Sequence, residues 1–293
     1  MIKISPKHKG IFYILLSAFC FACMSAFVRL SGDVPTIQKS FFRNIVALAV
    51  ALGVLVKNHQ GIRPENPKNL PMLLARSIFG TIGILANFYA VDHLLLSDAS
   101  MLNKMSPFFA VIASYFLLKE KVKLPQLLTL GGAFLGALFI IKPTLSNMAL
   151  IPALIGLGGG LCAGIAYTYV RKLGLHGEKG PLIVFFFSSF SCLAALPFVI
   201  FRYSPMSVSQ LLCLLGAGLA ATGGQFSITA AYCNAPAREI SVYDYSQVIF
   251  SAALGFFLFG DRPDVLSLIG YVLICSMAVM SFRYNNRALK KSN

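Results

Sequence analysis

The sequence predicts an all-α polytopic membrane protein with ten transmembrane helices in two inverted five-helix repeats. Of its 293 residues, 57% are hydrophobic and only 12% are charged, about half the charged fraction of a typical soluble domain. Apolar runs of roughly 20 residues recur along the chain, and each can cross about 30 Å of hydrocarbon as a helix. About ten such runs are too many for a signal peptide or a buried core. The third observation, an internal repeat, is described below.

The first apolar run follows the charged start MIKISPKHK. It is longer than the apolar part of a signal peptide, and no convincing small-residue cleavage site follows it, so we expect a retained helix. The seven cysteines lie within or beside apolar runs and are expected to pack as small buried side chains rather than to bind metal. The ten expected spans are residues 10–30, 35–57, 70–92, 95–118, 124–142, 149–170, 181–202, 207–232, 237–260 and 264–283.

The distribution of lysine and arginine predicts the orientation of these spans. With the N-terminus in the cytoplasm, 17 basic residues fall on the inner side and 4 on the outer side. This strong positive-inside bias places both termini in the cytoplasm and accounts for most of the net charge of +15 without a nucleic-acid partner. The 4 outer residues are Arg29, Lys142, Arg202 and Arg262, and the 4 basic residues inside spans are Lys39, Arg43, Arg76 and Lys104.

An offset of 141 residues aligns the middle of the chain with its end from about residue 74 to 142. The offset pairs Asp98 with Glu239, and Asn103 with Asp244. An offset of 142 then pairs Arg29 with Arg171. Each half holds five spans, an odd number, so the second copy must enter the membrane from the opposite side. Inverted repeats of this kind are common in secondary transporters, and we place the two repeats at residues 1–145 and 146–293.

The repeats carry a family resemblance. SPFFAVIASYFLLKEKVKLPQLLTLGGAFLGALFI in the first half and SQVIFSAALGFFLFGDRPDVLSLIGYVLICSMAVM in the second each hold an acidic residue between the last two spans. With FFRNIVALAVAL, these stretches resemble the drug/metabolite transporter superfamily, in particular its EamA-type members. The resemblance implies ten helices, an inner-membrane location and movement of small metabolites by alternating access, often as export. Asp261 stands where the family pattern has glutamate, which retains the carboxylate.

The stretch DASMLNKMSPFF places an ammonium group and a helix breaker inside a span. Lys104 lies close to the membrane midplane, where an unpaired ammonium costs about 2.5–3.5 kcal/mol, so it should face a cavity or a partner. Pro107 has no N–H, which frees the carbonyl of Asn103 and predicts a kinked helix. We expect Lys104 and Asn103 to contact substrate. The alternative is that Lys104 only pairs with a carboxylate, Asp98 or Asp244.

The second repeat places EISVYDYSQ at the same depth. Asp244 stands where Asn103 stands, and Tyr243 and Tyr245 flank it with hydroxyls and aromatic faces, so all three are candidates for substrate binding. Asp244, Glu239 and Asp98 are candidates for proton coupling, because a carboxyl group takes up a proton more readily when a cavity closes around it. Glu239 and Asp98 also lie near helix starts, where an acidic side chain favours the helix dipole.

Lys39 and Arg43 share one face of the second span, and Arg76 lies in the third. All three are substrate-binding candidates. As alternatives, Arg43 could brace the fold, Lys39 lies near enough to the outer interface to snorkel, and Arg76 could snorkel or pair with a carboxylate. Gly156, Gly160 and Gly164 recur every fourth residue in the sixth span, which predicts close approach of another backbone. Tyr167 follows them and is a further candidate for the cavity wall.

The sequence contains no HExxH, GxSxG or Walker motif, so we expect no catalytic or metal-binding residues and no cofactor. These features favour a secondary transporter or exchanger for a small anionic or zwitterionic metabolite such as an amino acid or organic acid, and the resemblance implies export. A membrane-embedded enzyme or a lipid-processing or lipid-flipping protein is the alternative. The expected partners are the metabolite and membrane lipid but no nucleic acid, with the chain acting as a monomer or homodimer in the inner membrane.

Overall fold

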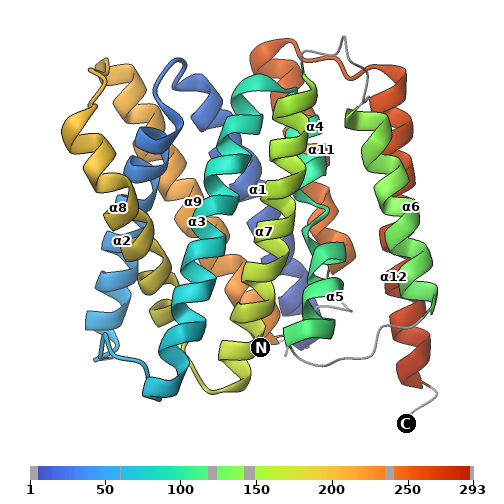
Figure 1. Cartoon of the computed structure of the whole chain (residues 1–293), viewed down its shortest axis with the longest axis horizontal. Helices are drawn as coiled ribbons and strands as arrows, with labels where there is room; N and C mark the ends of the chain where they lie inside the picture. Colours follow the sequence, from blue (N-terminus) through green and yellow to red (C-terminus); the bar gives the residue numbers. More distant parts are fainter. Residues whose placement is uncertain (1–5, 60, 118–123, 142–148, 235–240, 291–293) are drawn as a thin grey trace, which may run out of the picture.

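The computed structural model describes residues 6–59, 61–117, 124–141, 149–234 and 241–290, and every regular element in these ranges is a helix. The helices run side by side, and their ends lie at two opposite faces (Figure 1). The first half contains α1 (Pro6–Leu30), α2 (Thr36–Lys57), η1 (Pro67–Asn69), α3 (Leu70–His93), α4 (Leu96–Asn103), α5 (Ser106–Leu117) and α6 (Leu124–Ile141). The second half contains α7 (Leu150–Leu175), α8 (Gly180–Phe201), α9 (Val208–Asn234), η2 (Ser241–Tyr245), α11 (Ser246–Phe259) and α12 (Val265–Lys290).

Among the described residues, 8 helices are long and apolar enough to cross a membrane. The remaining two expected spans are α6, whose apolar part is shorter, and the consecutive helices α4 and α5. With 8 and 12 residues, α4 and α5 are each too short to cross hydrocarbon alone but together make one span. Large apolar side chains such as Phe116, Phe201 and Phe257 are exposed, as a lipid-facing surface requires. The predicted all-α polytopic fold is confirmed.

The packing of the helices follows the internal repeat. The most extensive contacts join α1 to α9, α3 to α7, α2 to α8 and α6 to α12. If each helix is replaced by its counterpart in the other half, the pair of α1 and α9 becomes the pair of α7 and α3. The pairs of α2 with α8 and of α6 with α12 stay the same. In Figure 1, α2 and α8 lie at one edge of the bundle, α6 and α12 lie at the other, and the remaining helices fill the space between them. This arrangement is that of two repeats related by a pseudo-two-fold axis.

The direction of the helices shows that the repeats are inverted. In Figure 1, α1 begins at the lower end of the bundle, whereas α7, its counterpart, begins at the upper end. The end of α12 lies at the lower end again, so α1 begins and α12 ends on the same side. Two ion pairs join segments at the upper end of the bundle. Arg29 Nη1 lies 2.6 Å from Asp261 Oδ2, and Lys39 Nζ lies 2.6 Å from Asp92 Oδ1.

Candidate functional site

The fourth span is interrupted in the middle of the bundle. α4 ends at Asn103, and Lys104 caps it with φ −74° and ψ 4° while its N–H donates to the carbonyl of Ser100 at 3.0 Å. α5 begins two residues later at Ser106. The sequence predicted a kink at this point, and the structure interrupts the helix altogether at Lys104 and Met105. Pro107 lacks the N–H that would join the two helices, and the first turn is where proline is tolerated in a helix.

The glycine face of α7 accommodates this break. A Cβ atom at Gly160 would lie 2.7 Å from the carbonyl oxygen of Leu102, and one at Gly164 would lie 2.6 Å from that of Ser106. Both distances are shorter than van der Waals contact allows, so only glycine lets α7 approach the interrupted backbone this closely. The predicted close approach is confirmed, and its partner is the break between α4 and α5.

The break positions Lys104 against the second half of the chain. Lys104 Nζ donates to Asp244 Oδ2 at 2.7 Å, and both side chains are only 4% exposed. Lys104 also caps the C-terminal end of α4, where the helix dipole favours a cation. The sequence analysis named Asp244 as one of the candidate partners, and the structure selects it. The other carboxylate oxygen of Asp244, Oδ1, is buried without a hydrogen-bond partner among the described residues.

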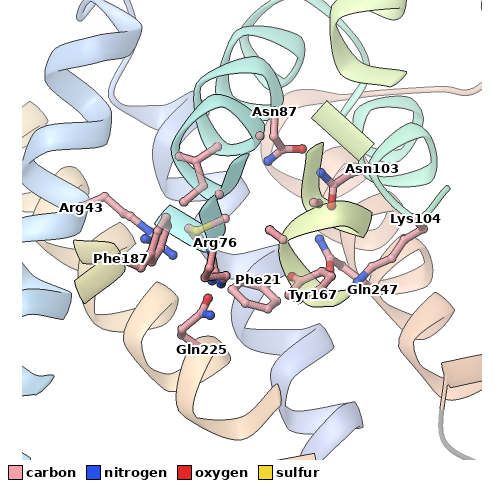
Figure 2. A pocket seen from close by; sticks show the side chains of 16 residues that line it. Phe21, Arg43, Arg76, Asn87, Asn103, Lys104, Tyr167, Phe187, Gln225 and Gln247 are labelled. Atoms are coloured by element: carbon pink, nitrogen blue, oxygen red, sulfur yellow. The ribbon is translucent and has the colours of Figure 1, made fainter. Parts of the chain in front are cut away.

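A small polar cavity of about 70 Å³ lies beside this pair, between the two halves of the chain. Figure 2 shows Arg43, Arg76 and Phe187 on one side of the cavity and Asn103 and Lys104 on the other, with Tyr167 between them. The wall is formed by Phe21, Met24, Arg43, Arg76, Gly80, Gly83, Ile84, Asn87, Asn103, Lys104, Ala163, Ala166, Tyr167, Phe187, Gln225 and Gln247.

Two arginines carry most of the positive charge of this wall. Arg43 on α2 and Arg76 on α3 are 1% and 3% exposed, and both guanidinium groups lie over the ring of Phe187, at 5.8 Å and 4.3 Å from its centroid. Arg76 Nε and Nη1 and Arg43 Nε have no hydrogen-bond partner in the described part of the chain. Arg76 neither snorkels nor pairs with a carboxylate there, which differs from the two alternatives weighed for it from the sequence.

Neutral groups fix the position of the Arg43 guanidinium. Its Nη1 donates to the side-chain oxygen of Asn44, whose amide nitrogen donates in turn to the carbonyl and hydroxyl oxygens of Ser40 at 2.9 and 3.1 Å. Asn44 therefore has its oxygen directed to the arginine. This network orients Arg43 but adds no negative charge, so the cation has no counter-charge among the residues that the structure describes.

Comparison with known proteins assigns the chain to a family. The model of the EamA-like transporter family matches residues 8–142 and again residues 150–283. The chain belongs to the EamA-like transporter family. It is a multi-pass membrane transporter, as the resemblance to the drug/metabolite transporter superfamily predicted.

The names of relatives of this EamA-like transporter refer to different substrates. The pseudopaline exporter CntI of Pseudomonas aeruginosa is 31% identical over 90% of this chain and 93% of its own length. A riboflavin transporter of Brucella anthropi is 25% identical over 86% of this chain and 90% of its own length. A solved crystal structure that is 15% identical superposes with a TM-score of 0.68 over 95% of this chain and 98% of its own, which shows the shared fold.

Five of the nine predicted substrate-binding residues line the cavity of the transporter: Lys104, Asn103, Arg43, Arg76 and Tyr167. Asp244 is tied to this wall through Lys104. Lys39 is elsewhere, because it is 1% exposed and bonded to Asp92 at the upper end of the bundle instead of snorkelling. Asp92 was missed as its partner because it lies 53 positions away in the sequence and carries no motif.

Tyr243 and Tyr245 line a different hollow of about 560 Å³, which is mainly apolar and lies between η2, α11 and α12. Asp98 accepts a hydrogen bond from the hydroxyl of Tyr271 on α12, at the first turn of α4. Neither tyrosine nor Asp98 is part of the wall of the polar cavity. Glu239, the remaining candidate for proton coupling, lies outside the described residues.

Sequence reasoning missed several cavity residues. Asn87, Gln225 and Gln247 bring neutral amides to the wall. Phe21 and Phe187 bring aromatic rings from α1 and α8, two helices on which the sequence analysis named no candidate. Amides within an apolar span were the available signal for the first three. Nothing distinguishes Phe21 or Phe187 among 25 phenylalanines in the sequence. The described residues contain no cluster of three or more side chains that could hold a metal ion.

Proposed function

We propose that this chain is a secondary transporter that exports a small anionic or zwitterionic metabolite, such as an amino acid or organic acid, by alternating access. The observation that carries this proposal is the pair of guanidinium groups of Arg43 and Arg76, which have no carboxylate partner within the described ranges and lie in the wall of a polar cavity between the repeats. Cations inside a membrane protein normally face a partner or a substrate path. The name of the pseudopaline exporter, a relative at 31% identity, supports export as the direction.

The size of the cavity supports alternating access. Ligand pockets usually measure about 300–1,000 Å³, whereas this cavity of about 70 Å³ has room for only a few water molecules. A metabolite therefore requires the two halves to move apart. Ion pairs that join the two halves, and that can be broken for this motion, occur at both ends: Arg29–Asp261 at one and Lys179–Glu65 at the other.

We infer that a proton gradient or exchange drives transport, since no nucleotide-binding motif occurs in the sequence. Asp244 is the preferred coupling carboxylate, because it is buried beside the cavity and its Oδ1 lacks a hydrogen-bond partner among the described residues. Asp98, bonded to Tyr271, and Glu239 are secondary candidates. Protonation of Asp244 would break its ion pair with Lys104, which lies in the cavity wall, and would so link protonation to the state of the cavity.

The remaining expectations complete the proposal. We place the transporter in the inner membrane with both termini in the cytoplasm, and we divide it into repeats at residues 1–145 and 146–293. We expect it to function as a monomer or homodimer in contact with membrane lipid and without nucleic acid. The positive-inside distribution of basic residues supports the orientation.

Metabolite profiling of cells that express the protein tests the proposed function. Culture medium and cell extract are compared among cells carrying wild type, an Arg43→Gln/Arg76→Gln double variant and an empty vector. We expect one or a few carboxylate-bearing compounds to rise in the medium and fall in the cells only with wild type. Counterflow of the same compounds in sealed proteoliposomes then shows that the protein itself moves them.

A membrane-embedded enzyme or a lipid-flipping protein, the competing class, would give a different result in these assays. A membrane-embedded enzyme converts its substrate in detergent, where no sealed compartment exists, and a lipid-flipping protein moves labelled lipid between leaflets of the proteoliposome. Chemical turnover in detergent, or lipid movement without any solute counterflow, would replace transport of a metabolite as the assigned function.

A further inference from the structure

We propose that Arg76 and Arg43, held around Phe187, form the subsite that binds a carboxylate group of the transported metabolite. This inference rests on the proposed transport function and deepens it, because it names the part of the cavity that recognises the negative charge. It also separates this role from that of Lys104, whose charge is already neutralised by Asp244.

The first argument is the difference between these two arginines and the other cations that are buried or partly buried. The buried Lys39 and Lys104 and the partly buried Arg29 each lie 2.6–2.7 Å from a carboxylate oxygen. None of the ion pairs in the described ranges involves Arg43 or Arg76, although both are at least as buried as Lys104. An unpaired buried charge destabilises a protein, so a site that keeps two of them has its counter-charge supplied from elsewhere.

The second argument is the geometry of Arg76. Its guanidinium carbon lies 4.3 Å from the centroid of the Phe187 ring, and Phe187 is itself only 1% exposed. Contact with a ring face holds the planar group but leaves the N–H groups at its edge free to donate. Nε and Nη1 are in fact without partners among the described residues. A planar fork of N–H groups matches the two oxygens of a carboxylate.

The third argument is Gly80, one turn along α3 from Arg76. A Cβ atom there would lie 2.0 Å from Arg76 Nη1 and 2.8 Å from the ring of Phe187. Any side chain at this position would therefore displace the guanidinium group from the ring. The glycine creates the space that keeps Arg76 over Phe187 and in the wall of the cavity.

The arrangement also indicates how the metabolite lies in the cavity. In Figure 2, Arg43, Arg76 and Phe187 occupy one side, and Asn103 and Lys104 occupy the other, beyond Tyr167. A carboxylate on the arginine side leaves the rest of the molecule among the amides of Asn87, Asn103 and Gln247. These amides donate and accept hydrogen bonds, so they suit a polar, uncharged or amino-bearing remainder.

Thermal unfolding of the full-length protein in detergent tests the subsite without knowledge of the natural substrate. Wild type, Arg76→Met and Lys104→Met are each heated alone and with succinate, L-alanine, their amides succinamide and L-alaninamide, and inorganic phosphate, all at equal ionic strength. Arg76→Met removes an uncompensated charge, so we expect its midpoint without ligand to rise by about 2–4 °C. Lys104→Met leaves the buried Asp244 carboxylate without its ion-pair partner, so we expect the unfolding midpoint of this variant to fall.

The ligand series identifies the chemistry that the site recognises. We expect at least one carboxylate to stabilise wild type more than its amide or phosphate does, and this effect to disappear in Arg76→Met. Gly80→Ala retains every charge and should weaken carboxylate binding about ten- to a hundredfold, the range for hydrogen bonds to a charged group. A Lys104→Met/Asp244→Asn double variant, which removes a neutral pair, should keep the carboxylate effect.

Three results would overturn the inference. They are a lower midpoint in Arg76→Met without ligand, equal stabilisation by carboxylates in wild type and Arg76→Met, and stabilisation by phosphate that exceeds that by every carboxylate. Each of them leaves the transport function standing if wild type still moves a metabolite in proteoliposomes. Failure of transport with an intact carboxylate effect would instead contradict the proposed function and retain the binding site.

Discussion

Individual residues in this transporter differ in whether their charge is satisfied within the protein. Lys104 and Asp244 form a buried pair that joins the two repeats at 2.7 Å, whereas Arg43 and Arg76 contact only neutral groups in the described part of the chain. All four residues looked alike from the sequence, as charges within apolar spans. The contacts of these residues distinguish two roles. The pair of Lys104 and Asp244 has a structural role, which can be tested by pairwise substitution, whereas the two arginines have a role in binding an anion.

A double-mutant cycle on Lys104 and Asp244 should show strong coupling. Lys104→Met and Asp244→Asn each leave one buried charge without its partner, so we expect each to lower the free energy of unfolding by about 3–5 kcal/mol. The double variant has no buried charge without a partner at this site and should recover most of the lost free energy of unfolding. Reversible unfolding in detergent measures the free energy of unfolding of wild type, the two single variants and the double variant. Additive losses in the double variant would mean that the two charges do not stabilise each other.

Transport by the same variants shows whether the pair also serves coupling. We expect wild type in proteoliposomes to respond to an imposed pH gradient and the Lys104→Met/Asp244→Asn variant to retain exchange of metabolite without that response. Asp98→Asn is the matched control, because its carboxylate accepts from Tyr271 outside the cavity wall. A pH response that survives in the double variant and is lost in Asp98→Asn would move the coupling role to Asp98.

At the scale of single elements, α7 depends on which of its glycines faces the interrupted span. Gly160 packs against the backbone of the break, where a Cβ atom would lie 2.7 Å from a carbonyl oxygen. Gly158 lies two residues away on another face, and beyond the adjoining backbone of α7 itself no atom of the described residues lies within 4 Å of the position of a Cβ there. The same residue type in the same helix therefore has opposite tolerance to substitution.

Alanine substitution at these two glycines should have opposite effects on stability. Gly160→Ala forces α7 away from the break and should cost about 1–3 kcal/mol, as overpacking does. Gly158→Ala places its methyl group in open space and should stabilise the helix by about 0.5–1 kcal/mol. Midpoints of thermal unfolding compare the two variants under identical conditions. Equal effects would show that α7 does not rely on the glycine face at Gly160 for its packing.

At the scale of the whole molecule, the orientation in the membrane remains a prediction from the distribution of charge. The loop after α2 and the loop after α8 lie at opposite ends of the bundle (Figure 1). Asn58 and Tyr203 are exposed residues in these two loops. If both termini are cytoplasmic, Asn58 faces the cytoplasm and Tyr203 faces the outside.

Cysteine labelling of intact cells measures this orientation. In a background without the native cysteines, we expect Tyr203→Cys to react with a membrane-impermeant maleimide and Asn58→Cys to react only after permeabilisation. Transport activity of each variant is the control for folding. Labelling of Asn58→Cys from outside, with protection of Tyr203→Cys, would invert the topology and the assignment of inner and outer ends.

The sequence by itself determined the fold class of this protein, because solvent imposes it. A chain in hydrocarbon must satisfy its backbone hydrogen bonds internally, so recurrent apolar runs of sufficient length can only be helices. The odd number of spans in each repeat then required the inverted arrangement, and the glycine spacing of α7 predicted a close approach. These patterns are local or periodic, and the sequence displays them directly.

Only the tertiary structure decided which charges are satisfied, because pairing depends on distance between helices that are far apart in sequence. Asp244 is 140 positions from Lys104 and Asp92 is 53 from Lys39, and no local pattern links either pair. The break after Lys104 likewise fits against the glycines of α7, where Cβ atoms would lie too close to the carbonyl oxygens of Leu102 and Ser106. The two arginines became the centre of the candidate site because the folded structure brought them around one phenylalanine ring and, among the residues that it describes, paired no carboxylate with them.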